Sequence, residues 1–362
     1  MNSIYLYSTI DDDESASGER KKVDMQVQAF RDLGYDVELI VEKKNHKAIR
    51  ILARMPGSYA YSKKTRNQVL DSINEDTEFI YIRKFLIDNS FLKLLKDIKK
   101  KTRIKVFLEI PTYPYDKEWG RVIDAPMLWK ERFFRKRIKR YVDRIITLDN
   151  SDVIFGVPCI RIVNGIGKTS IKPKKSIHNE GEIHLLAVAL FQPAHGYERL
   201  LEGLKNYYEK EHRSKIIFHL VGNGAKELYG DLIDSYGLNK YVVIHGSLYG
   251  AELDRMYDEC QLGISPLGPY KVGLIDVSSL KSVEYCSRGL PFIYAGNDIR
   301  FEKKDFKYAM KVENNGTCID VEDMIHFYEQ LPDDETVTKE MIEYAYENLE
   351  WTNIMRNVVN TL

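Results

Sequence analysis

Cysteine is scarce in this sequence, and its four copies follow no pattern that binds a metal or builds a disulfide framework. Cys159, Cys260, Cys286 and Cys318 are scattered, with no Cys-x-x-Cys pair and no His at zinc-like spacing. A metal site is therefore not expected. Reduced thiols in a cytoplasm fit this pattern best.

Long hydrophobic runs and an excess of one charge are also absent. No apolar stretch approaches the roughly 20 residues that a membrane-spanning helix needs. The acidic run from Asp11 to Glu14 follows a strand-like start, which is the opposite of a signal peptide's basic and apolar order. Lys+Arg and Asp+Glu balance at 54 each, so no general attraction to nucleic acid is expected. We expect a cytoplasmic protein, with attachment to the inner face of the plasma membrane as an open alternative.

The glycine motifs of nucleotide-hydrolysing and dinucleotide-binding proteins are missing as well. Gly222-Asn-Gly224 lacks the third glycine of the dinucleotide motif, and no complete P-loop is present, because Gly167-Lys168-Thr169 has Ile162 where the motif needs its first glycine. Neither NAD binding nor ATP hydrolysis is supported, and no cofactor is expected.

What the sequence does contain is a repeated alternation of short apolar runs with amphipathic stretches. This alternation is typical of parallel sheets covered by helices, and 362 residues suffice for two such domains. We predict strands in the first half at Ile4–Ser8, Tyr35–Val41, Phe79–Ile82, Lys105–Ile110 and Arg144–Thr147. A lysine- and proline-bearing linker, 168–176, follows, and the alternation restarts with strands at His184–Ala189, Ile216–Val221, Val242–His245 and Leu262–Ser265.

The predicted fold class is thus α/β, with two Rossmann-like doubly wound parallel-sheet domains facing a central cleft. We expect an N-terminal domain over residues 1–170 and a C-terminal domain over 171–340. Residues 341–362 are expected to be helical and to cross back to the N-terminal domain, with Trp351 and Met355 packing outside the second core.

The segment from Gly273 to Pro291 carries the most chemical information. Ser278 or Ser279 is a good helix N-cap and Gly289 a good residue to end the helix. The N–H groups at such a helix start, together with Lys281 in the first turn, suit a diphosphate. Glu284 falls on or beside the face that should meet the sheet, and an ion pair with Arg288 is the alternative explanation for it.

At this point the sequence resembles the retaining GT-B glycosyltransferases of the family 4 type. The signature of that family is a pair of acids eight positions apart, which Asp276 and Glu284 match. The resemblance implies that Glu284 holds the ribose hydroxyls, that Asp276 contacts the transferred sugar and that the backbone between them, including Leu280, receives the diphosphate. The family's first acid is usually Glu, so the shorter Asp276 is a departure.

Shorter motifs extend the resemblance over most of the chain. Gly18 stands in a segment similar to the family's first glycine loop, Asn223 lies in a glycine turn and His245 in the turn near the base. Asn164-Gly165-Ile166 resembles the interdomain motif, although Gly167 replaces its acid. His195-Gly196 stands where many relatives have Lys-Gly. Because the usual upstream Arg is missing, Arg199 is the candidate for the second cation on the diphosphate, with a surface pair to Glu202 as the alternative.

Acceptor binding is predicted at the loop that follows the strand Lys105–Ile110. Aromatic and acidic side chains suit sugar rings and hydroxyls, and a rigid turn with surface tyrosines is the alternative. The candidate acceptor residues are Glu109, Thr112, Tyr113, Tyr115 and Asp116.

A basic stretch from Trp129 to Tyr141 could lie on an anionic membrane. It interleaves seven basic residues with aromatics. An ordinary helix that packs its aromatics on the sheet is the alternative, and nucleic acid is not expected.

Together these residues predict a glycosyltransferase that moves a sugar from a nucleoside diphosphate, with UDP as the expected nucleotide, to a hydroxyl of a lipid-linked glycan. The resemblance implies retention of configuration and no metal. A non-catalytic homologue that binds a partner transferase or glycan, and a sugar epimerase or phosphorylase of the same fold, remain as alternatives.

Overall fold

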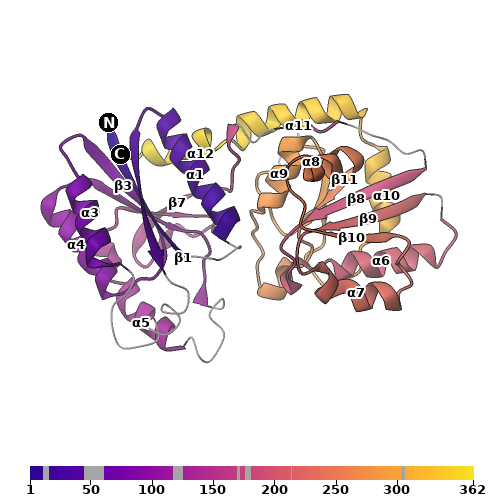
Figure 1. Ribbon diagram of the computed structural model, residues 1–362, viewed down its shortest axis with the longest axis horizontal. Helices are drawn as coiled ribbons and strands as arrows, with labels where there is room; N and C mark the ends of the chain where they lie inside the picture. Colours follow the sequence, from indigo (N-terminus) through magenta and orange to yellow (C-terminus); the bar gives the residue numbers. More distant parts are fainter. Residues whose placement is uncertain are drawn as a thin grey trace. The chain divides into compact units, whose positions relative to one another are not determined.

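The computed structural model describes residues 1–10, 16–44, 61–116, 125–168, 172–175, 181–212, 214–302 and 306–362. It divides into two compact units, each with its own sheet (Figure 1). Unit 1 comprises Met1–Val163 and Trp351–Leu362, and unit 2 comprises Asn164–Glu350. The acidic run 11–14 and residues 169–171 and 176 of the linker lie outside the described residues.

The sheet of unit 1 has the strand order β2-β1-β3-β4-β5-β7-β6, and its described pairs are parallel except for β6 with β7. The strands are β1 (Asn2–Ile10), β2 (Asp36–Lys44), β3 (Thr77–Arg83), β4 (Lys105–Ile110), β5 (Arg144–Thr147), β6 (Val153–Ile154) and β7 (Val157–Arg161). The helices of unit 1 are α1 (Ala16–Asp32), α3 (Lys63–Ser72), α4 (Asn89–Lys101), α5 (Ala125–Arg135) and α12 (Trp351–Val359).

Helix α4 shows how sequence pattern becomes packing in this unit. Asp88 caps it by accepting a hydrogen bond from the Phe91 amide at 3.1 Å. Its apolar residues recur at helical spacing and are buried, namely Phe91, Leu94, Leu95 and Ile98. The opposite face of α4 is therefore left to lysines in solvent.

Unit 2 has the strand order β10-β9-β8-β11-β12-β13, with every pair parallel. Its strands are β8 (Glu182–Val188), β9 (Lys215–Val221), β10 (Val242–Gly246), β11 (Leu262–Ile264), β12 (Phe292–Ala295) and β13 (Ala309–Val312). Its helices are α6 (Glu198–Tyr208), α7 (Ala225–Ser235), α8 (Gly250–Glu259), α9 (Leu280–Arg288), α10 (Val321–Glu329) and α11 (Asp334–Asn348).

The strand order of unit 2 reverses between β8 and β11. From β8 the chain builds outward through β9 and β10, and it then returns to β11 on the other side. Loops that leave neighbouring strands in opposite directions open a crevice at their carboxyl ends, which is where ligands bind in such sheets. The predicted doubly wound α/β class is confirmed in both units.

The boundaries of the units differ from those expected from the sequence. Unit 2 begins at Asn164 rather than at 171, because Asn164 is hydrogen-bonded to Ser278 of the same unit. It extends to Glu350 rather than to 340, because α11 packs against α9, with Thr338 close to Gly289. Residues Trp351–Leu362, mainly α12, pack in unit 1 against α1.

None of the helices in the described part of the chain is long and apolar enough to span a membrane.

Candidate donor site in unit 2

The loops that follow β8 and β11 meet at the switch point of the unit 2 sheet. The Leu267 amide donates to the His195 carbonyl oxygen at 2.7 Å. Gly196 has a φ of +69°, and a Cβ there would lie 2.5 Å from the backbone nitrogen of Gly268. Only glycine permits this approach, so the two loops are fixed relative to each other by their sequence.

The start of α9 lies in the same region and is capped as predicted. Ser279 is the N-cap residue, and its hydroxyl accepts from the Lys281 amide at 3.2 Å. Asn164 fixes the preceding Ser278 through two hydrogen bonds. The Asn164 backbone N–H donates to the Ser278 hydroxyl at 2.9 Å, and the Asn164 side-chain amide donates to the Ser278 carbonyl at 2.6 Å. The motif around Asn164 therefore supports the helix start.

A buried arginine that the sequence interpretation missed completes this support. Arg300 is 4% exposed and donates to the carbonyls of Asn164, at 2.8 Å, and Ser279, at 3.0 Å. Asp298 pairs with its guanidinium at 2.5 Å. No local sequence pattern distinguishes Arg300 from a surface arginine. Its position shortly after β12 is the only signal that could have indicated this role.

Lys281 is half-buried in the first turn of α9. Burial lowers the pKa of its ammonium to about 8, and the Glu284 carboxylate opposes that shift. Within the described part of the chain, no carboxylate lies within 4 Å of the Lys281 ammonium. The Lys281 ammonium is therefore available to pair with an anionic ligand.

His195 is a second side chain of this region, and its imidazole feels the charge of Lys281. Burial, and then the charge of Lys281, lower the pKa of the imidazole to about 3, so the ring is neutral near pH 7. Its Nδ1 accepts from the Gln192 amide at 3.3 Å, which puts the proton on Nε2. A neutral N–H donor that feels the Lys281 charge suits a phosphate oxygen or a sugar hydroxyl.

Glu284 does not pair with Arg288, which was the alternative explanation for its place on α9. Arg288 instead pairs with Asp254 at 2.5 Å and stacks on the Tyr257 ring at 4.5 Å. Glu284 is half-buried near Tyr257. The pKa of the Tyr257 hydroxyl lies well above its ordinary value, mainly because the hydroxyl is buried and also because the Glu284 charge is close. The carboxylate makes no ion pair with any residue that the structure describes.

Asp276 lies in the loop before α9, where its backbone pairs with Asn297 in an isolated bridge. Its Oδ1 is 3.4 Å from the Asn297 amide nitrogen, and its side chain is half-buried. Leu280, at the start of α9, is 43% exposed. The two acids and the helix start therefore belong to one edge of the unit 2 sheet, while their roles stay predictions.

Arg199 takes part in a different set of interactions from the one expected. Its side chain is buried, its Nε donates to the Thr317 carbonyl at 2.7 Å and its Nη1 donates to the Leu267 carbonyl. It makes no ion pair with Glu202 within the described residues. Because these two donors are used by backbone oxygens, Arg199 in this structure positions the loop after β11 rather than presenting a free cation.

The remaining predicted donor residues are spread out. Asn223 is exposed after β9, and its carbonyl accepts from the Phe191 amide at 2.8 Å. His245 is the second-last residue of β10, and its Nε2 lies 2.8 Å from the Nδ1 of His219. Gly18 lies in α1 of unit 1.

In unit 1, Glu109 ends β4 in a buried ion network. It is 1% exposed and accepts from Lys22 at 3.0 Å, Arg83 at 2.5 Å and Tyr81 at 2.9 Å. Burial alone would raise the pKa of Glu109, but the two cations lower it to about 2. Its oxygens are thus engaged within unit 1, and Glu109 orders the strand ends instead of offering an open carboxylate.

The rest of the predicted acceptor loop is tied to α5. Asp116 accepts from Arg132 at 2.8 Å and from Arg135 at 2.6 Å, and the Arg135 bonds lower the pKa of its carboxyl. Tyr115 is buried, with the Lys84 ammonium 3.8 Å from its ring centre. Thr112 and Tyr113 are half-buried.

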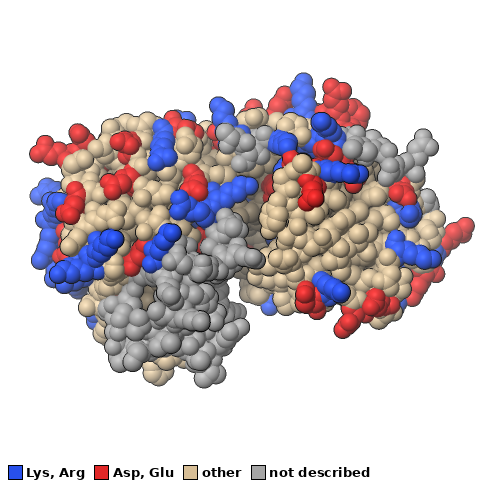
Figure 2. All heavy atoms as spheres, in the orientation of Figure 1, with Lys and Arg blue, Asp and Glu red and all other residues tan. Residues whose placement is uncertain are grey.

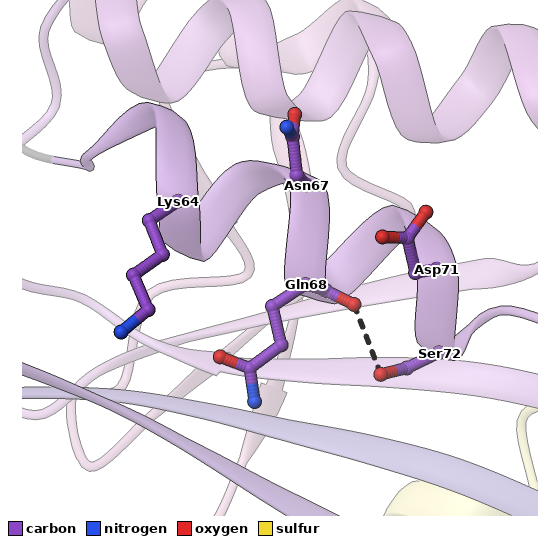
Figure 3. Close-up of a pocket in the computed structure, with 5 residues that line it drawn as sticks. All are labelled: Lys64, Asn67, Gln68, Asp71 and Ser72. Carbon is purple, nitrogen blue, oxygen red and sulfur yellow. Dashed lines mark hydrogen bonds between the residues drawn. The ribbon is translucent and has the colours of Figure 1, made fainter.

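A separate hollow on α3 lacks the features of a ligand site (Figure 3). Its lining comes from one helix and is made of Lys64, Asn67, Gln68, Asp71 and Ser72. Ser72 bonds back to the Gln68 carbonyl at 2.9 Å, as the dashed line shows. Its only charged side chains, Lys64 and Asp71, are exposed and of opposite sign, so the hollow favours no particular class of ligand.

No protein-family model and no curated protein sequence matches the chain. Solved structures match it over almost its full length. A glycosyltransferase from Rickettsia africae is 11% identical at a TM-score of 0.64, covering 99% of this chain and 97% of that one. Sucrose-phosphate synthase from Thermosynechococcus elongatus is 12% identical at a TM-score of 0.66, with 100% and 98% covered. Anabaena HepE, solved with UDP, is 13% identical at a TM-score of 0.64, with 100% and 99% covered.

These similarities cover both α/β units of this chain, and the neighbours are GT-B glycosyltransferases. The chain therefore has the GT-B fold of these glycosyltransferases.

Proposed function

We propose that the protein transfers a sugar from a nucleoside diphosphate to a hydroxyl group of a glycan acceptor, with retention of configuration and without a metal. The observation that carries this proposal is the start of α9, where Lys281 and Glu284 stand at the switch point of the unit 2 sheet without ion-pair partners among the described residues. UDP is the proposed nucleotide, in line with the UDP in the Anabaena structure.

Different residues of unit 2 would bind different parts of the donor. The N–H groups of α9 and the Lys281 ammonium would receive the diphosphate, with the His195 Nε2–H as a further donor. Glu284 would accept from the ribose hydroxyls, and Asp276 would contact the sugar. Arg300 and Arg199 would act as positioning residues, because each holds backbone carbonyls of a loop that borders this region.

In the proposed step the bond between the anomeric carbon and the diphosphate oxygen breaks, and a bond to the acceptor oxygen forms. The electron pair of the broken bond goes to the diphosphate, where Lys281 and the helix start stabilise the new charge. The acceptor's hydroxyl proton moves to the departing phosphate oxygen. No protein base is needed in this step, and the pKa of about 3 makes the His195 imidazole a weak one.

The acceptor is proposed to be a lipid-linked glycan in polysaccharide or glycoconjugate biosynthesis. Two observations support this part: the stretch 129–141 exposes Trp129 and Phe133, and Tyr113 in the predicted acceptor loop is half-buried rather than enclosed. Membrane attachment would keep such an enzyme near a lipid-linked acceptor at the cytoplasmic face.

The test is donor binding and turnover with a panel of nucleotide sugars. Lys281→Ala and Glu284→Ala are each expected to lower donor affinity or turnover by about tenfold or more, because each removes a charged contact worth roughly 1.5–3 kcal/mol. The controls Lys226→Ala and Glu343→Ala remove the same charges from exposed positions of unit 2 and should leave both readouts unchanged.

Wild-type activity in Lys281→Ala and Glu284→Ala would refute the donor site. Donor binding without transfer or hydrolysis for any nucleotide sugar would favour the non-catalytic homologue instead. Interconversion of the free nucleotide sugar would favour an epimerase.

A further inference from the structure

A basic groove runs between α4 and the 3-10 turn η3 (Ile138–Arg140) of unit 1. It has a volume of about 450 Å³ and contains five cations, namely Lys93, Lys96, Lys100, Arg137 and Arg140. Figure 2 shows lysine and arginine side chains gathered on the side of unit 1 where α4 lies. None of these residues takes part in the proposed donor site.

The charges of this groove are not neutralised by the protein. Lys93, Lys96 and Lys100 are exposed on one face of α4, at spacings of three and four residues. Among the residues that the structure describes, none of the five cations has a carboxylate within 4 Å. The one acid in the lining, Asp97, lies 3.7 Å from Arg66. The groove therefore offers several cations to one polyanionic partner.

Exposed aromatic side chains adjoin the groove. Trp129 is 73% exposed and Phe133 is 60% exposed, one turn apart on α5. Arg137, which lines the groove, stacks its guanidinium 4.2 Å from the centre of the Phe133 ring. The basic groove and the aromatic pair thus form one continuous surface, joined at Arg137.

The basic stretch 129–141 alone does not account for this surface. Arg132 and Arg135 are used by Asp116, and α5 ends at Arg135 rather than continuing as one helix to residue 141. Ile138 is fully buried, so η3 is anchored in the core while Arg137 and Arg140 remain exposed. The lysines of α4, far away in the sequence, supply the larger share of the charge.

We propose that this surface binds an anionic lipid bilayer, with the phosphates of lipid head groups in the groove and Trp129 and Phe133 among the head groups and upper acyl chains. A bilayer is the partner that presents a dense layer of phosphates over an apolar interior, and aromatic rings favour that boundary. Single-stranded nucleic acid is the competing polyanion, since bases can stack on an exposed ring such as Trp129, and the test below therefore includes an oligonucleotide.

This inference deepens the proposed membrane attachment and does not depend on glycosyl transfer. Its test is sedimentation of the full chain with vesicles of phosphatidylcholine alone or mixed with phosphatidylglycerol. We expect binding only to the mixed vesicles. Lys93→Gln/Lys96→Gln should weaken it about 25-fold, since each cation near such a surface contributes a factor of about five.

The matched control is Lys226→Gln/Lys240→Gln, which removes two exposed lysines from unit 2 and should change binding by less than about twofold, because neither lysine lines the groove. Trp129→Ser/Phe133→Ser should abolish the part of the binding that survives high salt. Thermal melting and UDP-glucose binding should be unchanged in the groove variant, which separates this test from that of the donor site.

Two results would overturn the proposal: the wild-type chain fails to bind the mixed vesicles, or the groove variant binds them as tightly as the control does. If vesicles do not bind but an oligonucleotide binds the wild-type chain and not the groove variant, the groove is assigned to nucleic acid instead.

Discussion

At the scale of single residues, Lys281 carries the clearest pH dependence. Burial gives its ammonium a pKa of about 8 in the free protein, so it is charged below that pH and loses its proton as the pH rises through it. A diphosphate prefers the charged form. Affinity for UDP-glucose, whose diphosphate does not titrate in this range, should be constant below about pH 7 and fall by up to about tenfold per pH unit above pH 8.

Lys281→Arg is the control for this pH profile, because a guanidinium stays charged throughout the range. Calorimetric titration of both proteins between pH 6 and about pH 9.5 checks it. A flat profile in the wild-type protein, or the same decline in both, would show that Lys281 does not bind the donor's charge.

At the scale of elements, the approach of the loops after β8 and β11 is the feature that assembles the donor site. Gly196→Ala forces a Cβ to within 2.5 Å of the Gly268 nitrogen, so the loops must move apart and His195 must shift away from Lys281. We expect a loss of about 2–4 kcal/mol in the free energy of unfolding, the sum of left-handed strain and overpacking. Donor affinity should fall with it, as measured by denaturant unfolding and titration with UDP-glucose.

Gly237→Ala provides the matched comparison for Gly196→Ala. Gly237 has nearly the same φ, +68°, but a Cβ there would meet nothing within 4 Å. It should therefore cost only the strain of the left-handed backbone, about 1–2 kcal/mol, and leave donor affinity unchanged. Equal effects of the two substitutions would contradict the account of the loop contact.

At the scale of the whole molecule, the last twelve residues belong to unit 1 although the chain reaches them from unit 2. Trp351 is 1% exposed in the core beneath α1, with the Lys22 ammonium 5.4 Å from its ring. Trp351→Ala should lower the stability of unit 1 by about 3–5 kcal/mol through the cavity that it leaves. Hydrogen exchange should show the loss in α1 and β1, and not in the sheet of unit 2.

Trp129→Ala is the control for this substitution, because Trp129 is 73% exposed in the same unit. Its effect on stability should stay within about 0.5 kcal/mol. A uniform loss of protection in both units after Trp351→Ala would mean that the two units unfold together.

The fold and the start of α9 were predictable because they depend on local patterns. Alternating apolar runs predicted most strands of both sheets, and Ser279 and Gly289 bounded a helix that the structure shows at Leu280–Arg288. The donor roles of Lys281, Glu284 and Asp276 stay predictions. Strand β13 and helix α10 received no prediction.

The partners of individual charges were not predictable in the same way. From the sequence, Arg199 and Glu109 were predicted to be available charges and Arg288 a possible partner of Glu284, but each is bound to groups from distant segments. Those partners lie 26 to 118 residues away along the chain. Sequence periodicity relates only residues within a few turns of one another, so it cannot distinguish a charged side chain with a hydrogen-bonding partner from one without.

The sequence by itself thus determined the class of the fold, the capped helix at the donor site and the candidate pair of acids, because hydrophobic periodicity and capping act over a few residues. Only the tertiary structure decided which cations stay unpaired, that the charge of Lys281 acts on His195, and that α4 and η3 join into one basic groove. Those outcomes depend on strand order and loop contact, which bring together residues that no local pattern connects.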